Sequence, residues 1–570
     1  MNHELYTTFQ YSSIKECLVT FRQYETQLLV NLLQNLDKNI CLFLDEELNY
    51  DLNQIMMGSK IFKKNQVTIW NSLNSHIEIK QNQLLSKIKS FLFIVKPTTE
   101  NMENIVLHYY KYSKPQYKFV VCFIPHSTPQ CKQILIDKGV YGKLIIKECP
   151  IYLFPIDGDL LSMEIDHHSH SLSFVAKALV DFHGFTANTK IHVKGPNSKI
   201  IQSMIHSLMS PETSAKNESN QIDTLILFDR SNDWIPLLTL PITYEALIYE
   251  MFDVKGGIFY IDTKAIYLND HDDVFRNLRN LHYEDAKTVW HQMLKMTVIE
   301  KPHEESPINL VQDFVQNIKS FQTKKKQLGI HLKILEFIVE HHLGINSQFF
   351  IDQWKMERAI LNESVKLNDI IDEHLVDDSY PINSILRLLC LYSVVNNGLS
   401  KKEYQLVLSK LYEFYSTQHN DIDQLIQKLN KLKILTTKNN NLIHSLKQSF
   451  SFAKEEIGEL FSKKKSTSTI IDKLNSVQNI IKDFIPFSCH DIVKIISNVT
   501  NNFSELTSGQ TSGQTFGQTS EENKIENIIV FFVGGVTFTE ITVLRLFSKL
   551  CPNINLTIMT TRLVNSKSLF

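Results

Sequence analysis

A short histidine-rich run is the part of this sequence that looks most like a metal site. Its members are Asp166, His167, His168 and His170, and Asp157 and Asp159 lie shortly before them. Phosphoesterases that bind two metal ions use Asp-His-His runs together with further aspartates at neighbouring strand ends. Adjacent side chains do not easily converge on one ion, so a polar loop is the interpretation that we favour. A metal-dependent hydrolase stays open as a rival hypothesis.

The glycine pair Gly534-Gly535 follows an apolar run at 528–533 and invites comparison with a phosphate-binding loop. Such loops stack backbone amides around a phosphate and usually add a lysine. Here there is no G-K-[ST] and no G-x-G-x-x-G, and Glu540 stands where a phosphate favours a cation. Thr537 and Glu540 instead have the spacing of a capping box. We therefore predict a structural turn, with a nucleotide-dependent hydrolase as the alternative.

No other residue pattern indicates catalysis. No serine lies in a G-x-S-x-G elbow, and His341-His342 lacks the H-E-x-x-H spacing of a zinc helix. The eight cysteines are scattered without a C-x-x-C pair, which favours buried, reduced thiols. We predict a protein that is not an enzyme, with no catalytic residues, no cofactor and no bound metal.

An arginine stands between two aspartates directly after an apolar run at 224–228. The segment reads Asp229, Arg230, Asp233 and then Pro236. A guanidinium group there can bridge two carboxylates and fix the loop at a strand end. We interpret the segment as a clamp at a joint between domains.

The composition is that of an ordinary globular protein. The 570 residues are 43% hydrophobic and 21% charged, and the formal net charge is -2. This balance gives no overall attraction to nucleic acid or to anionic membranes, although local basic patches stay open. The N-terminus lacks a signal-peptide pattern, and no apolar run reaches bilayer length. We expect a cytoplasmic protein that binds no nucleic acid and associates with membranes only indirectly.

Apolar runs and helical patterns alternate in two regions that flank a long helical stretch. Continuous apolar runs predict strands buried on both faces of a parallel sheet. The predicted fold class is α/β plus an all-α insert. The predicted boundaries are 1–148 for a first α/β domain, 149–250 with 524–570 for a discontinuous second one, 251–506 for the helical insert and 507–523 for a low-complexity Ser-Gly-Gln-Thr loop.

The clearest helix of the insert is predicted to begin at Ser306-Pro307 and to end at Gly329, where a second helix follows. Its apolar residues recur at steps of three and four, with Lys325 as the exception, at Val311, Phe314, Ile318, Phe321 and Leu328. Such a stripe packs against another helix, either within the domain or from a partner. If the partner reading is right, Lys319, Lys324, Lys325 and Lys326 would steer an acidic helix. The hairpin is predicted near 283–342.

Four segments, which occur along the chain in the same order as in the family, resemble the Sec/Munc (SM) family of SNARE-binding proteins. They are the D-R-x-x-D segment at 229–233 with the T-Y-E-x-L-I segment at 243–248, Phe154-Pro-Ile-Asp-Gly-Asp, Ser384-Ile-Leu-Arg-Leu-Leu-Cys, and Gly534-Gly-Val-Thr-Phe-Thr-Glu540. The second and third are similar to the vacuolar protein sorting thirty-three branch. The structural signature thus comprises Asp229, Arg230, Asp233, Pro236, Tyr244, Glu245, Gly534, Gly535, Thr537 and Glu540. Trp234-Ile235 and the Ser-Gly-Gln-Thr loop depart from the family pattern.

The resemblance implies an arch of three domains whose helical hairpin holds SNARE helices before fusion. It implies SNARE-binding roles for Lys319, Lys324, Lys325, Lys326 and His331. The branch further implies membership of the HOPS and CORVET tethering complexes, a helical partner subunit, and peripheral recruitment to late endosomes, lysosomes or vacuoles. A purely structural tether subunit that never contacts SNAREs is the remaining alternative.

Overall fold

The fold was obtained as a computed structural model. It describes residues 14–36, 39–56, 62, 64–65, 67–74, 87–165, 171–182, 185–186, 188–209, 222–268, 271–297, 308–343, 348–372, 381–415, 419–438, 470–508 and 525–570. Within helices, the side chains at 14–22, 53–56, 171, 308–319, 342–343, 419–421, 470–472 and 500–508 fall outside that description.

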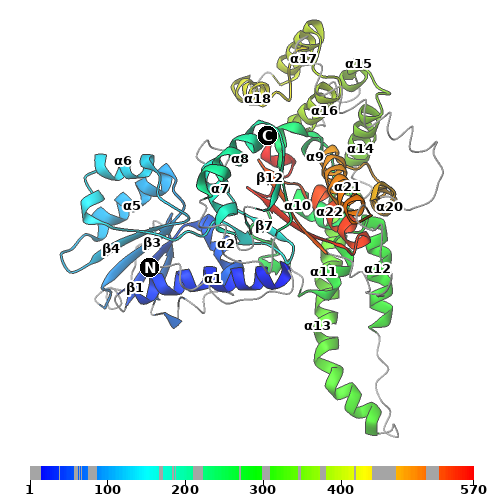
Figure 1. The fold of residues 1–570 in the computed structure, drawn as a ribbon. Coiled ribbons are helices and arrows are strands. Elements are labelled where there is room, and N and C mark those ends of the chain that lie inside the picture. The colour runs from blue at the N-terminus through cyan, green and yellow to red at the C-terminus, as the bar shows by residue number, and fades with distance from the viewer. Residues whose placement is uncertain are drawn as a thin grey trace.

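The first domain is a five-stranded parallel sheet with helices on both faces (Figure 1). The strand order is β2-β1-β3-β4-β5. The strands are β1 (Ile40–Leu44), β2 (Val67–Ser72), β3 (Ser90–Val95), β4 (Lys118–Phe123) and β5 (Ile145–Glu148). The helices are α1 (Ile14–Gln34), α2 (Glu46–Met56), α5 (Thr99–Tyr112) and α6 (Pro129–Asp137). The central strands β1 and β3 are fully buried, as continuous apolar runs predict.

The second sheet combines strands that precede the helical insert with strands that follow it. Its order is β6-β7-β13-β12-β9-β8, and all neighbours are parallel except β6 and β7. The strands are β6 (Phe154–Pro155), β7 (Leu160–Ser162), β8 (Lys190–Lys194), β9 (Thr224–Asp229), β12 (Glu526–Val533) and β13 (Ile554–Thr560). The helices that follow these strands or connect them are α7 (Ser171–Asp181), α8 (Pro196–Leu208), α9 (Ile235–Leu238), α10 (Tyr244–Met251) and α22 (Phe538–Leu550).

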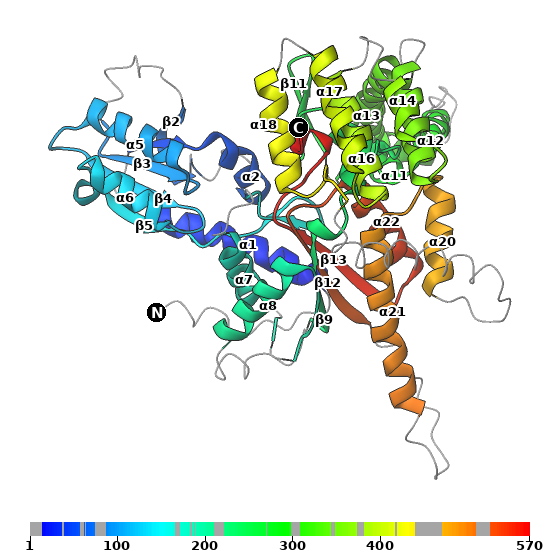
Figure 2. The ribbon, with the colours of Figure 1, turned by 90° about the horizontal axis from the view of Figure 1, so that it is seen from above.

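Helices dominate the region between β9 and β12 (Figure 2). They are α11 (Asp273–Leu278), α12 (Tyr283–Met296), α13 (Ile308–Ile338), the π-helical turn η5 (Val339–Leu343), α14 (Gln348–Leu361), α15 (Leu367–Ile370), α16 (Ile382–Val395), α17 (Lys401–Phe414), α18 (His419–Lys431), α20 (Ile470–Ile481) and α21 (Phe487–Ser508). A two-stranded antiparallel hairpin, β10 (Ile258–Ile261) with β11 (Lys264–Tyr267), was not predicted.

The predicted fold class is confirmed, because two largely parallel α/β sheets flank a helical region inserted into the second. The numerical domain boundaries stay predictions. One prediction about the insert is wrong: α13 continues through Gly329 to Ile338 as one helix of 31 residues. A single glycine costs a helix only about 1 kcal/mol, and the buried residues on either side outweigh that cost. Ser306-Pro307 and residues 509–523 of the predicted loop lie outside the described residues.

Among the helices described, none is long and apolar enough to cross a lipid bilayer.

Candidate functional site

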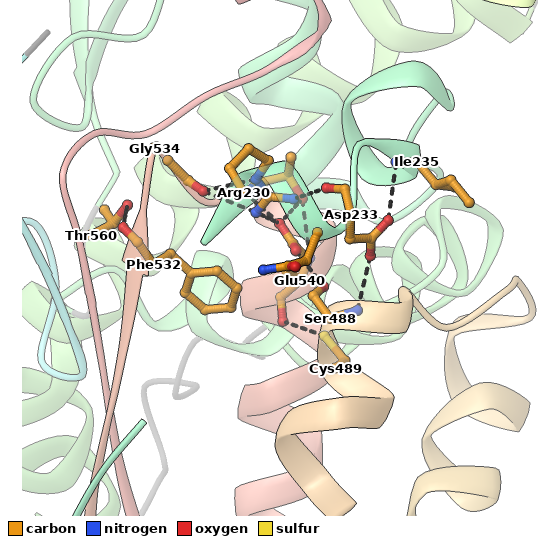
Figure 3. Close-up of polar contacts among 12 residues, drawn as sticks. Arg230, Asp233, Ile235, Ser488, Cys489, Phe532, Gly534, Glu540 and Thr560 are labelled. Carbon is orange, nitrogen blue, oxygen red and sulfur yellow. Dashed lines mark hydrogen bonds and ion pairs between the residues drawn. The ribbon is translucent and has the colours of Figure 1, made fainter. Parts of the chain in front are cut away.

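Arg230, at the carboxyl end of β9, is buried against the C-terminal segment of the chain. Its Nε and Nη2 donate to the carbonyl oxygen of Gly535 at 3.1 and 2.9 Å, and Nη2 also donates to Glu540 Oε2 at 2.7 Å. Its Nη1 donates to the backbone oxygen of Asp233 at 2.9 Å (Figure 3). The guanidinium group therefore ties β9 to the β12–α22 connection, which lies about 300 residues later in the sequence.

The partners of Arg230 differ from the predicted ones. The carboxylate of Asp229 accepts from the backbone amides of Ser231 and Asn197, and that of Asp233 accepts from the amides of Ile235 and Ser488. The carboxylates of the two aspartates bind backbone amides at turns. The carboxylate that pairs with the guanidinium group is therefore that of Glu540. The interpretation as a joint clamp stands, but the clamp closes on a different carboxylate.

Glu540 and Thr537 form the predicted capping box at the start of α22. Glu540 Oε2 accepts from the Thr537 amide at 3.0 Å, and Oε1 accepts from the Ser488 hydroxyl group at 2.5 Å (Figure 3). Ser488 belongs to α21 of the insert. A single buried carboxylate thus holds the inserted region, the strand β9 and the C-terminal helix together.

The Gly534-Gly535 turn is structural. Gly535 has φ of +109°, and a Cβ there would lie 2.5 Å from Val564 Cγ1, so no other residue fits without strain. Its carbonyl group is occupied by Arg230, and the Gly534 amide donates to Thr561 Oγ1. With the turn committed to internal contacts, the described geometry gives no support to a nucleotide site.

Asp233 illustrates the electrostatics of the clamp. Burial, reinforced by the nearby Glu540, raises the pKa of its carboxyl group to about 6, although Arg230 and two backbone amides act in the opposite direction. Burial also raises the pKa of the neighbouring Cys489 thiol well above its ordinary value. A thiol held protonated is a poor nucleophile.

Glu245, another residue of the signature, belongs to a second buried network. Its carboxylate accepts from Arg279 Nη2 at 2.6 Å and from Arg545 Nη1 at 2.9 Å. Arg545 also binds Asp157 at 3.1 Å and Asp159 at 2.7 Å, and Arg279 binds Asp157. These are the two aspartates considered above as metal ligands, and the arginines satisfy them.

The other candidate metal ligands, from Asp166 to His170, lie outside the described residues. Within the described ranges, no three His, Cys, Asp or Glu side chains gather in a metal-binding arrangement. Pro236 is buried in the first turn of α9 and has a packing role.

The base of the hairpin formed by α12 and α13 is anchored in the core of the second domain. Tyr244 shares a hydrogen bond of 2.8 Å with Nδ1 of His331, whose Nε2 lies 3.3 Å from Asp272 Oδ2. The His331 ring stacks on Phe275 and is only 1% exposed. The structural role of Tyr244 in the signature is therefore to hold His331 of α13 in place.

His331 was grouped with the lysines as a SNARE-binding hypothesis, but in the structure its side chain is buried. Its side chain is enclosed between α10 and α11, so it does not reach the surface. It connects α13 to Tyr244 of α10 and to Asp272 before α11.

A groove of about 280 Å³ lies beside this anchor, between α12 and α13. Trp290 lines it and donates from Nε1 to the carbonyl oxygen of Leu328 at 3.0 Å. The remaining lining residues are Lys287, His291, Leu332, Leu335, Glu336, Val339 and Glu340. No sequence signal indicated this groove.

The predicted lysines lie on α13 beyond the anchor. Lys325 and Lys326 are exposed and Lys324 is half-buried. The backbone of Lys319 belongs to α13, but its side chain is outside the described residues, as are those of the apolar stripe up to Ile318. Figure 1 shows this half of α13 extending away from the rest of the molecule. The site therefore consists of a projecting helix, the lysines on its projecting part (the shaft, residues 308–327), and the groove where the helix joins the domain.

The chain is similar to known proteins over nearly its whole length. It is 24% identical to the vacuolar protein-sorting-associated protein 33 homolog of Arabidopsis thaliana, with 97% of this chain and 96% of that one covered. It is 25% identical to vacuolar protein sorting-associated protein 33A of Rattus norvegicus, with 84% and 86% covered. The fold matches the SM protein Vps45 in complex with the Qa SNARE Tlg2, with a TM-score of 0.59 at 16% identity and 96% of both chains covered.

The Sec1 family model matches residues 40–570, which span both sheets, the hairpin and the clamp. This protein belongs to the Sec1 family.

Proposed function

We propose that this protein binds SNARE helices on the hairpin of α12 and α13 and aligns them before membrane fusion. It would act as a subunit of a HOPS- or CORVET-type tethering complex, recruited peripherally to late endosomes, lysosomes or vacuoles. Support comes from the sorting function in the names of its relatives and from the Qa SNARE held by its structural neighbour. The activity proposed is binding and not catalysis.

The observation that carries the proposal is the contrast between the two ends of α13. Leu328, Ile334 and Ile338 are at most 1% exposed and lie in the core of the second domain. On the N-terminal side of Leu328 the helix projects outward and exposes the lysines. A rigid projecting helix is a platform along which a partner helix can lie.

Alignment on such a platform is useful because a helix is costly to nucleate. The first turn fixes several backbone dihedral angles for a single hydrogen bond. A surface that holds SNARE segments in helical form and in register removes part of that cost before the bundle closes. The lysines would accelerate the encounter with an acidic helix, since exposed charges act mainly on association rates.

The test is binding of late-endosomal SNARE domains to the full-length protein without any other tether subunit. The variant K324E/K325E/K326E changes the charge of the shaft by six units. We expect its association rate to fall about tenfold at low salt, with a smaller effect at high salt. The variant K401E/K402E/K428E is the matched control, because these lysines are exposed on α17 and α18, at the opposite end of the molecule from the hairpin tip (Figure 1).

A second variant, Leu332→Asp, places a charge in the groove and is expected to accelerate dissociation. Equal rates for wild type and both hairpin variants would remove the hairpin from the mechanism. No binding of SNARE domains by the wild type would favour a purely structural tether subunit.

A further inference from the structure

We propose that the amino edge of the first sheet is a docking surface for an anionic lipid bilayer. By amino edge we mean the end of the first domain where β3, β4 and β5 begin and where α5 and α6 end. Neighbouring parallel strands start together there, with Ser90 paired to Lys118 and Val120 paired to Ile145.

Six exposed lysines gather at this edge because of the topology. In parallel β-α units, the residues before each strand and after each helix meet at the same end of the sheet. The six are Lys87 and Lys89 before β3, Lys111 and Lys114 after or at the end of α5, and Lys138 and Lys143 between α6 and β5. Direct contacts confirm the proximity: the Lys118 amide donates to Lys89 O, and the Tyr110 hydroxyl group donates to Lys138 O at 2.8 Å.

The positive charge of the amino edge is almost uncompensated. From 104 to 147 the sequence holds seven lysines, and Asp137 is its single acidic residue. Glu100 and Glu103 lie in the first turns of α5, at the opposite end of the sheet. None of the ion pairs found among the described residues involves the six lysines. The net charge of -2 for the whole chain conceals this local surface, which is why the composition predicted only indirect membrane association.

Large apolar side chains are exposed on the same surface. Leu107 and Tyr110, one turn apart on α5, are 60% and 59% exposed. Ile136 at the end of α6 is 50% exposed, and Ile145 at the start of β5 is 46% exposed. Apolar side chains surrounded by lysines are typical of surfaces that insert shallowly between lipid headgroups.

The choice of a lipid bilayer over an acidic protein rests on the kind and spread of the cations. The chain has no arginine between Arg22 and Arg230, so every cation of the amino edge is a lysine. Arginine suits bidentate recognition of individual carboxylates, whereas lysine acts as a hydrated point charge. Lysines distributed over two helix ends and the starts of three strands fit a diffuse, flat anionic surface.

Among the described residues, the orientation of the first domain leaves this edge clear of the second domain. At the opposite end of β3, Lys96 donates to the backbone oxygen of Glu164 at 2.8 Å, so that end faces the second domain. Figures 1 and 2 both show the first domain projecting to one side, with the α12–α13 hairpin on the other. A bilayer bound at the amino edge would therefore not cover the hairpin.

The test is flotation of the full-length protein with vesicles of phosphatidylserine and phosphatidylcholine, compared with vesicles of phosphatidylcholine alone. We expect the wild type to float with the anionic vesicles, and less so as salt is raised. The variant K111E/K114E/K138E is expected to lose at least about 100-fold in partition coefficient, since each lysine near an anionic surface contributes about a factor of five.

The control K401E/K402E/K428E carries the same charge change on α17 and α18 and is expected to bind like the wild type. The variant L107S/I136S is expected to weaken binding without changing its salt dependence. The proposal is wrong if the wild type does not prefer anionic vesicles, or if the two triple variants float equally. Binding of an acidic peptide by the same lysines, without vesicle binding, would assign the edge to a protein partner.

Discussion

Removing the charge of Glu540 is the perturbation for which the structure gives the most definite expectation. In Glu540→Gln, the amide oxygen can still accept from Arg230 and Thr537, and the amide nitrogen can donate to the Ser488 hydroxyl group. The hydrogen bonds therefore survive and only the charge is lost. Arg230 is 1% exposed, and it would lose the one carboxylate with which it forms a direct ion pair.

The magnitude follows from the burial of the pair. Breaking a buried ion pair by neutralising one member costs about 3–5 kcal/mol, because the remaining charge stays in a poorly solvated site. For a unit of 150–250 residues this lowers the melting temperature by about 6–20 °C. Arg230→Met is expected to give a loss of similar size.

The double variant R230M/E540Q separates charge pairing from packing. With both charges gone, we expect a loss smaller than the sum of the single losses by about 2–3 kcal/mol. The assay is thermal unfolding of the four proteins, with hydrogen exchange of residues 535–545 as a local readout, since a multidomain chain need not unfold in one step. Additive losses, or an unchanged melting temperature for E540Q, would refute the proposed clamp.

Two further predictions concern backbone strain and pH. Gly535→Ala is expected to lower the melting temperature, because its Cβ would collide with Val564. Gly329→Ala, in open space within α13, is expected to raise the melting temperature by reducing the entropy of the unfolded chain. Equal shifts of the two variants in a thermal melt would contradict this. Burial raises the pKa of Glu357 to about 7, so its stabilising contribution is present below about pH 4.5 and is lost as pH rises through 7. Relative to the wild type, Glu357→Gln should therefore become more stable from pH 5 to pH 8, and a pH-independent difference in melting temperature would disprove that assignment.

The apolar runs predicted the sheets well, because strands buried on both faces leave an unmistakable local pattern. Phe531 and Phe228 are buried in adjacent strands, and both runs were visible in the sequence. The β10–β11 hairpin was missed, since Tyr260 and Tyr267 are exposed and the strands are only four residues long. Short, half-exposed strands carry a weak signal.

The candidate site was predictable only in part. The types of the signature residues indicated a clamp, but Arg230 and Glu540 are 310 residues apart, so local spacing could not identify that pair. His331 was grouped with the lysines of the same helix as a SNARE-binding hypothesis. Its burial depends on Tyr244 and Asp272 from other elements, which a helical period does not reveal.

The central claim, that SNARE helices lie along the hairpin, is tested most directly by photocrosslinking. A photoreactive amino acid at Leu332 reports on the groove, and one at Leu406, exposed on α17, is the control. With late-endosomal SNARE domains added to the full-length protein, the account predicts crosslinks from position 332 and none from position 406. Crosslinks at both positions alike, or at neither while the SNARE domains remain bound, would contradict it.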